Sequence, residues 1–190
     1  STLSHVQVGD YARLGEGVTI HRSIEDQGKT VVGQNCFLMG NSHVAHDCIL
    51  GEHTILANSV LLGGHVTIGS NSFLGGGAGV HQFVRIGEGC MLGGLSEITL
   101  DIPPQVLVSG RNNISGLNTI GLKRRKIPKS EIALLKQYLL SVLGKGNPRK
   151  NALNLLSGEE HTQSQIISNF LNFFLSGNRG FARLSYKTSG

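Results

Sequence analysis

The chain has 190 residues, of which 39% are apolar and only 5% aromatic, with 27 glycines and no tryptophan. This composition argues against an ordinary two-layer domain and favours a regular, tightly turned solenoid. The formal charge of +5 suits nucleic acid, phosphorylated metabolites or acidic proteins as partners. No apolar run approaches the roughly 18 residues of a membrane span, so no membrane span is predicted.

A six-residue repeat runs through the first half of the chain. From Val32 onward, every sixth residue is Val, Leu or Ile as far as Ile98. Four positions after each of these comes a small or β-branched residue, and glycine often follows the aliphatic one. The same register occurs upstream at Val8, Leu14 and Ile20 and breaks over 24–29, which we predict to be a loop.

A period of six matches neither a helix nor a simple strand, but it suits one short strand followed by one turn. Three such faces close a triangular coil of eighteen residues, with the aliphatic side chains inside. We therefore predict a mainly β fold, in which a left-handed parallel β-helix covers 1–104. The repeat is expected to end at Pro103-Pro104, because proline cannot donate to the strand ladder.

The remaining residues are predicted to form a linker over 105–127 and a small C-terminal α-helical domain over 128–190. Apolar periodicity and capping residues predict helices over 128–143 and 147–156. A third helix is expected to begin at Glu159 and Glu160 and to end at Gly177.

All three cysteines, Cys36, Cys48 and Cys90, occupy the small interior position of the repeat. We expect them to be inert packing residues. They form no CxxC pair and cannot all be joined in disulfides, so a reduced, cytoplasmic location is predicted.

Several polar residues are not explained by the repeat. With eighteen residues per coil, His46 stacks on Gly64 and Gly64 on Gln82, while His65 and His81 lie one residue away from this column. His43 is on the neighbouring hexad. These residues should gather on one ridge within roughly 10 Å, because coils stack about 4.8 Å apart. Imidazoles placed together support proton transfer near neutral pH. His5 and His53 do not share the ridge and are predicted to be surface residues.

A metal site is the rival interpretation of the histidines, because three imidazoles and a water make a catalytic zinc site. Some hexapeptide-repeat trimers, the gamma-class carbonic anhydrases, use two histidines five residues apart. His43 and His46 are only three residues apart, and no other pair lies close enough. We therefore predict no metal.

The second group of polar residues that the repeat leaves unexplained is the basic run 121–126. Such a run is often a solvated face or a nucleic-acid patch, but aromatic residues interleaved for base stacking are absent here. We predict no nucleic-acid partner. An arginine pair, Arg124-Arg125, suits a diphosphate or a phosphorylated carrier.

The repeat and its motifs together resemble the UDP-N-acetylglucosamine O-acyltransferases of lipid A biosynthesis. The motifs that carry this resemblance occur in that family's order and spacing, at 41–48, 63–65, 80–83, 101–104 and 121–125. The similarity extends from about Val8 to Arg179-Gly180.

The resemblance implies a cytoplasmic homotrimer with active sites in clefts between neighbouring prisms. It implies transfer of a 3-hydroxyacyl chain from acyl carrier protein to the 3-position of UDP-N-acetylglucosamine, with no tightly held cofactor. His46 would be the general base, Asp47 would orient it, and the N–H of Gly64 would hold the oxyanion. The implied substrate-binding positions are His43, His65, His81, Gln82, Asn118, Arg124 and Arg125. The implied acyl tunnel ends near Met39 and Gly94.

Two departures from the family are visible. Its members begin with several more coils, which carry an acidic residue that grips the sugar, and they often have an acid where Ile120 stands. Two alternatives therefore stay open. One is a hexapeptide acyltransferase that uses acyl-CoA, and the other is a shortened, non-catalytic trimeric binding or scaffold paralogue.

Overall fold

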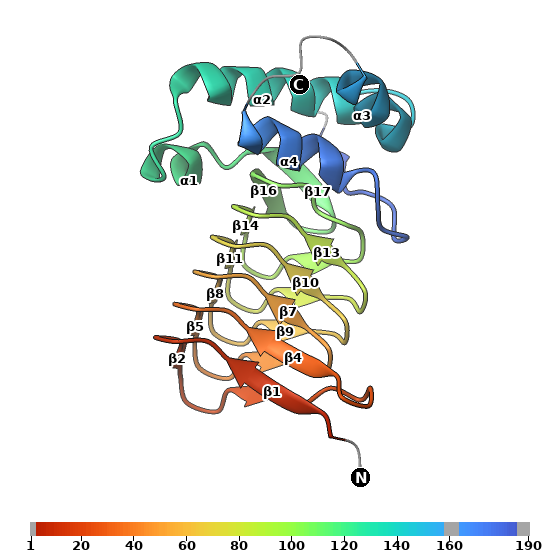
Figure 1. Ribbon diagram of the computed structural model, residues 1–190. Coiled ribbons are helices and arrows are strands. Elements are labelled where there is room, and N and C mark those ends of the chain that lie inside the picture. Colours follow the sequence, from red (N-terminus) through yellow and green to blue (C-terminus); the bar gives the residue numbers. More distant parts are fainter. Residues whose placement is uncertain (1–2, 158–163, 186–190) are drawn as a thin grey trace.

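The computed structural model describes residues 3–157 and 164–185 (Figure 1). Short parallel strands stack into a three-sided prism, the left-handed parallel β-helix that the repeat predicts, and the helices lie at the end of the stack where β16 and β17 sit. No helix within the described ranges has the length and apolar character that crossing a bilayer requires.

Three sheets form the sides of the prism. Sheet A contains β1 (His5–Val8), β4 (Lys29–Val32), β7 (Ile49–Leu50), β10 (Thr67–Ile68) and β13 (Arg85–Ile86). Sheet C contains β3 (Thr19–Ile20), β6 (His43–Val44), β9 (Leu61–Leu62), β12 (Gly79–Val80) and β15 (Glu97–Ile98). Sheet B contains β2 (Arg13–Leu14), β5 (Phe37–Leu38), β8 (Ile55–Leu56), β11 (Phe73–Leu74), β14 (Met91–Leu92), β16 (Val106–Ser109), β17 (Asn113–Leu117) and β18 (Arg183–Leu184).

The strand register shows where the repeat is interrupted. Ile49 pairs with Thr67, and Thr67 pairs with Arg85, so one coil takes 18 residues. Between β3 and β6, however, Thr19 pairs with His43, an offset of 24. The additional residues lie in the segment 21–28, which has no strand. The loop predicted over 24–29 overlaps this segment, but Lys29 already belongs to β4.

The prism interior contains the aliphatic column of the repeat, and from Val32 to Ile98 each of its residues is buried. Cys36, Cys48 and Cys90 are also buried, and each thiol donates to a backbone carbonyl. Burial raises the pKa of Cys48 to about 11 and that of Cys90 to about 12. The thiols are therefore packing residues, as predicted.

The corners of the prism share one backbone geometry. From residue 35 to residue 95, every sixth residue has a positive φ, and most of these residues are not glycine. This series comprises Asn35, Asn41, Asp47, His53, Ser59, His65, Asn71, Gly77, Phe83, Gly89 and Leu95. The left-handed conformation costs an ordinary residue roughly 1–2 kcal/mol, so a bulky side chain at a corner calls for a reason other than folding.

The stretch 105–127 is not the linker that the sequence suggested. β16 extends sheet B by pairing in parallel with β14, and β17 pairs with β16 in the antiparallel direction. Helix α1 (Thr119–Arg124) follows. Pro103 and Pro104 lie in the turn before β16, where no ladder hydrogen bond is needed, so they do not end the sheet.

The predicted helices over 128–143 and 147–156 are confirmed as α2 (Lys129–Leu143) and α3 (Pro148–Leu156). The expected start of the third helix, Glu159 and Glu160, lies outside the described residues. Within them, α4 runs over Gln165–Phe173 and stops before Gly177. Its apolar face, with Ile167 and Phe170, is buried.

A buried ion pair attaches the helices to the prism. Arg85 donates from Nε to Asp101 at 2.8 Å, and the Asp101 side chain is fully buried. The same guanidinium donates to Ser176 Oγ at 2.6 Å and lies 4.4 Å from the ring centre of Phe173. These contacts fix the segment that follows α4 against the last coils.

Candidate active site

The turns that connect sheet C to sheet A lie above one another and form what we call the C–A corner, made of segments 21–28, 45–48, 63–66 and 81–84. The column arithmetic is confirmed here, because His46, Gly64, His65, His81 and Gln82 all lie on this corner. His43 belongs to the adjacent strand β6.

His46 and Asp47 form a hydrogen-bonded pair. The His46 Nδ1 atom lies 2.9 Å from Asp47 Oδ2. An ionised carboxylate only accepts, so Nδ1 carries the proton and Nε2 keeps a lone pair. The His46 side chain is 31% exposed and that of Asp47 only 10%. The arrangement is that of an imidazole base oriented by a carboxylate.

Asp47 is itself held by the 21–28 loop. Its carboxylate accepts from the Ser23 hydroxyl and from the N–H of Ile24 at 3.2 Å. Burial raises the pKa of Asp47, but the hydrogen bonds from Ser23, His46 and Ile24 outweigh burial and hold that pKa below its usual value. The sequence predicted this loop but not its role, because a break in periodicity does not show what the loop contacts.

Gly64 lies directly against the His46 ring. A Cβ atom on Gly64 would be 2.5 Å from Cε1 of His46, so a side chain there would displace the imidazole. Among the residues that the structure describes, none accepts a hydrogen bond from the Gly64 N–H. Within this part of the chain, the Gly64 N–H is therefore an unpaired backbone donor beside the His46 ring.

His65 and Phe83 continue the column that begins at Asp47. His65 Nε2 lies 3.9 Å from Asp47 Oδ2, and its ring meets the His46 ring edge-on at 5.2 Å. The His65 ring also stacks on Phe83, with ring centres 4.7 Å apart and planes 11° apart. Phe83 was not predicted as a site residue, although it follows Gln82 in the motif at 80–83.

His43 contacts different partners. Its Nδ1 atom lies 2.7 Å from Thr19 Oγ1, and its ring meets that of His21 at 4.7 Å. Burial, and then the charge of His21, lower the pKa of His43. The sequence analysis did not single out His21, because it lies beside the loop where the register changes.

Within 3–157 and 164–185, His46, Asp47 and His65 also form a cluster that could hold a metal, since their ligand atoms lie within 4.8 Å of one another. The Asp47 carboxylate, however, already accepts from Ser23, Ile24 and His46. That donor set matches an orienting carboxylate better than a free metal ligand.

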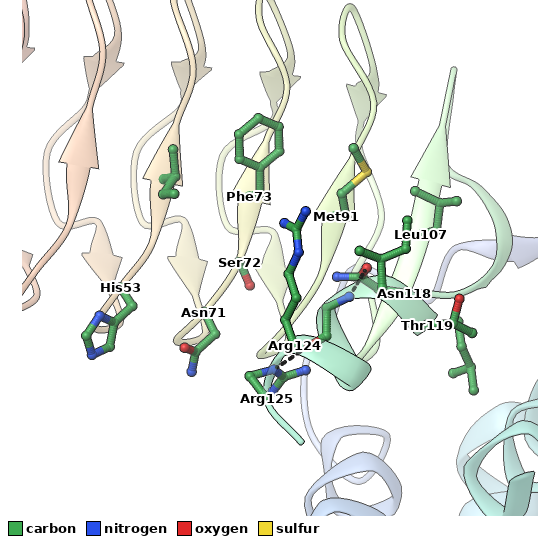
Figure 2. Close-up of a pocket in the computed structure, with 14 residues that line it drawn as sticks. His53, Asn71, Ser72, Phe73, Met91, Leu107, Asn118, Thr119, Arg124 and Arg125 are labelled. Carbon is green, nitrogen blue, oxygen red and sulfur yellow. Dashed lines mark hydrogen bonds between the residues drawn. The ribbon is translucent and has the colours of Figure 1, made fainter. Parts of the chain in front are cut away.

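Asn118, Arg124 and Arg125 lie elsewhere, around a cavity of about 610 Å³ on the outer face of sheet B (Figure 2). Its apolar floor consists of Ile55, Phe73, Met91 and Leu107. Figure 2 shows Arg124 extending across the cavity toward Phe73 and Met91. His53 also lines this cavity, and it is exposed and away from the C–A corner, as predicted.

Two of these cavity residues are fixed by hydrogen bonds. Asn118 caps α1 by accepting from Gly121 N at 3.0 Å, and it donates to Gly89 O at 2.9 Å. Arg125 donates to Gln105. The cavity is thus a preformed apolar groove with cationic and amide groups at one end.

A single chain does not unite all the residues that the resemblance implied. The C–A corner and the sheet B cavity lie on different sides of the prism. Met39 and Gly94 lie on the corner between sheets B and C, where Met39 follows β5 and Gly94 follows β14, three coils away.

Family models match both parts of the chain. A model of bacterial transferase hexapeptide repeats matches residues 29–64, and one described as UDP-N-acetylglucosamine O-acyltransferase, domain 2, matches 101–182. The prism and its repeats therefore define a hexapeptide-repeat transferase.

Relatives of known function define the family. The acyl-[acyl-carrier-protein]–UDP-N-acetylglucosamine O-acyltransferase of Campylobacter lari is 44% identical over 189 residues, which cover 98% of this chain and 70% of the relative. The equally named protein of Paracoccus denitrificans is 38% identical, covering 88% of this chain and 65% of the relative. The chain belongs to the UDP-N-acetylglucosamine O-acyltransferase family, and it spans about two thirds of the length of such relatives.

Solved structures agree. The UDP-N-acetylglucosamine acyltransferase of Campylobacter jejuni is 37% identical with a TM-score of 0.87, and the similarity covers 96% of this chain and 72% of that one. The corresponding Francisella novicida enzyme is 31% identical with a TM-score of 0.88, covering 98% and 68%.

Proposed function

We propose that this chain transfers a 3-hydroxyacyl group from acyl carrier protein to the 3-position of UDP-N-acetylglucosamine, the first step of lipid A biosynthesis. The relatives' names contain this donor and this acceptor. The observation that carries the proposal is the His46–Asp47 pair beside the bare backbone of Gly64.

The reaction follows from these groups. His46 Nε2 removes the proton from the sugar 3-hydroxyl, and the hydroxyl oxygen attacks the thioester carbonyl. The negative charge that forms on the carbonyl oxygen is stabilised by the Gly64 N–H. The intermediate collapses to an ester, and the departing thiolate takes the proton from His46. Asp47 stabilises the imidazolium that His46 forms between these two steps. The proton taken from the sugar hydroxyl is thus the one delivered to the thiolate.

The remaining features supply recognition. Arg124 and Arg125 suit the diphosphate of the sugar nucleotide, and the apolar floor of the sheet B cavity suits an acyl or pantetheine chain. The net charge of +5 favours approach of an acidic carrier protein. A carrier-protein substrate is consistent with a cytoplasmic location.

A homotrimer explains why the site residues lie on two sides of one prism. In such an assembly, the C–A corner of one copy faces the sheet B cavity of its neighbour, and each active site forms between two copies. Met39 and Gly94, on the corner between sheets B and C, then border the acyl tunnel.

The direct test is the variant His46→Ala. It should fold normally but lower the rate of transfer by roughly 10²–10⁴, the usual contribution of a positioned base. Transfer is measured from a panel of 3-hydroxyacyl carrier proteins to UDP-N-acetylglucosamine, which also gives the preferred chain length.

His5→Ala is the matched control, because His5 is an exposed histidine on β1, at the end of the prism opposite the helices. Near-normal activity of His46→Ala would remove His46 from the mechanism. Transfer only from acyl-CoA would favour another hexapeptide acyltransferase, and no transfer by the folded protein would favour a scaffold.

A further inference from the structure

Arg179 reaches the C–A corner from the C-terminal part of the chain. It lies in the segment between α4 and β18, and its Nη2 atom is 3.0 Å from Nδ1 of His81, which is 98 residues away in the sequence. Nη2 and Nε also donate to the carbonyl of Thr99, at 3.2 and 3.3 Å. None of the steps derived above uses Arg179.

This contact determines where His81 carries its proton. A guanidinium group has only donors, so it can bond to Nδ1 only if Nδ1 accepts. The Gln82 carbonyl lies 3.3 Å from the same nitrogen, but a carbonyl is also an acceptor and would need a proton there. The two contacts compete, and the charged donor, which is closer, determines the outcome.

We infer that Arg179 is a positioning residue that holds His81 as the neutral tautomer protonated on Nε2, so that His81 offers a donor to the substrate. The group that it addresses is an acceptor oxygen of the sugar nucleotide. This inference rests on the proposed function for its substrate, but the tautomer itself is a property of the protein alone.

The segment that carries Arg179 is anchored on both sides, as a positioning residue requires. On one side, Arg149 Nη2 donates to Gly177 O at 2.7 Å, and a Cβ atom on Gly177 would collide with Arg85 and Asp101. On the other side, Asp101 N donates to Gly180 O at 2.9 Å. Arg179 therefore projects from a fixed backbone and is not a freely moving surface side chain.

The geometry also gives the C-terminal helices a part in the site. The ion pair between Arg85 and Asp101 holds the segment, the segment holds Arg179, and Arg179 orients His81. A hydrogen-bonding chain of this kind resembles the outer groups that orient histidines at other functional sites.

The first test reads the tautomer directly. In the full-length protein labelled with ¹⁵N-histidine, two-bond ¹H–¹⁵N spectra above neutral pH distinguish Nδ1–H from Nε2–H, and His81→Gln assigns the signals. The wild type should show His81 protonated on Nε2. Arg179→Ala should shift it to a mixture, and Arg179→Lys, which keeps a cationic donor, should retain the wild-type pattern more closely. A wild-type His81 protonated on Nδ1, or an unchanged spectrum in Arg179→Ala, would overturn the inference.

The second test measures kinetics with UDP-N-acetylglucosamine and a 3-hydroxyacyl carrier protein. Arg179→Ala should raise KM for the sugar nucleotide about 2- to 10-fold, the equivalent of one hydrogen bond, with a smaller change in kcat. Arg179→Lys should recover part of the loss. Arg111→Ala is the matched control, because Arg111 is an exposed arginine whose ion pair is with Glu97, at 3.4 Å, and not with His81.

The two tests separate the proposed acyl transfer from the positioning role of Arg179. A wild-type protein without acyl transfer would contradict the proposed function, while the spectra would still decide the tautomer. Unchanged kinetics in Arg179→Ala, together with normal wild-type activity, would overturn the role of Arg179 and leave the proposed function intact.

Discussion

At the scale of single residues, Phe83 is unusual. It has a φ of 64° and is 51% exposed, so it occupies a conformation that most residues avoid and gains little from burial. Gly77 and Gly89 fill the next corners of the same series on either side. Stability does not explain a phenylalanine here, but its stack on His65 does.

Replacing Phe83 should therefore separate stability from activity. We expect Phe83→Asn to melt at the same temperature or higher, because asparagine tolerates the left-handed conformation. Its kcat/KM should fall about 2- to 10-fold, the range that the loss of one aromatic pair allows. Calorimetry and the transfer assay measure the two effects, and Phe83→Tyr, which keeps the stack, should retain most of the activity. Unchanged activity in Phe83→Asn would mean that the stack does not support His65.

Asp47 links the site to acid stability. Its pKa is lowered in the folded protein, so the folded state binds a proton less readily than the unfolded chain, whose Asp pKa is about 3.9. The resulting stabilisation is complete above that unfolded pKa. It is lost as the pH falls through the folded-state pKa.

The variant Asp47→Asn removes this contribution. Its free energy of unfolding should depend less on pH below about 4 than that of the wild type, because the titrating group is gone. Urea unfolding at pH 3, 4, 5 and 7 measures the difference. Asparagine suits the positive φ of 62° at this corner, so backbone strain does not confuse the comparison. Parallel curves for the two proteins would show that Asp47 does not stabilise the fold through its charge.

At the scale of the element, two adjacent glycines of one turn, Gly63 and Gly64, have different neighbours. A Cβ atom on Gly64 would press on the His46 ring, whereas one on Gly63 would lie 2.7 Å from the backbone nitrogen of Gln82. An imidazole can rotate away, but a stacked backbone cannot move without disturbing the next coil.

We therefore expect Gly64→Ala to fold with nearly normal stability and to lose most of its activity. Gly63→Ala should instead lower the free energy of unfolding by roughly 1–3 kcal/mol, the usual cost of overpacking. Chemical unfolding and the transfer assay on both variants provide the comparison. Equal stability losses in the two would show that both glycines serve only the packing of the coils.

The sequence predicted the strands well for a physical reason. Each hexad from Val32 to Ile98 places one aliphatic residue inside the prism. The six-residue pattern of aliphatic residues therefore predicts both which residues are buried and where the strands lie. The signal ends where the geometry changes. β17 runs antiparallel and leaves the hexad pattern, which is why the stretch 105–127 was predicted as a linker.

The placement of the candidate site residues was predicted in part. Column arithmetic placed His46 beside Gly64, because stacking depends only on residue number. It could not predict that Ser23 binds Asp47 or that Arg179 binds His81, since a loop and a distant segment supply those groups. Such contacts depend on tertiary folding and have no period in the sequence.

At the scale of the whole molecule, the separation of the C–A corner from the sheet B cavity makes a clear prediction. Two variants, His46→Ala and Arg124→Ala, each damage one side of the site that we propose is shared between copies, and both should be nearly inactive. Co-expressed at equal amounts, they should regain about one quarter of the wild-type sites, because random mixing joins an intact corner to an intact cavity that often.

Activity of the unfractionated co-expressed protein measures this recovery. In a trimer, oligomers purified through two different tags each contain one intact site, so their activity should reach about one third of wild type. The control is the mixture of two separately tagged His46→Ala chains, which should remain inactive. If mixed oligomers form but activity does not return, each chain carries its own complete site and the shared arrangement is wrong.

The offset of 24 residues across the 21–28 loop, against 18 in the coils between β4 and β15, has a consequence for how such a chain can change its length. Six residues equal one hexad, so the inserted segment could have joined the wall as a further face. The interior pattern would have survived, but every later face would have rotated by a third of a turn about the prism axis. By bulging outward, the loop preserves the angular phase of the stack. Insertions and deletions that leave the core intact can thus still move Gly64 and His65 to another side of the molecule. The side of the prism on which each turn lies therefore constrains this fold as strictly as the burial of its aliphatic residues does.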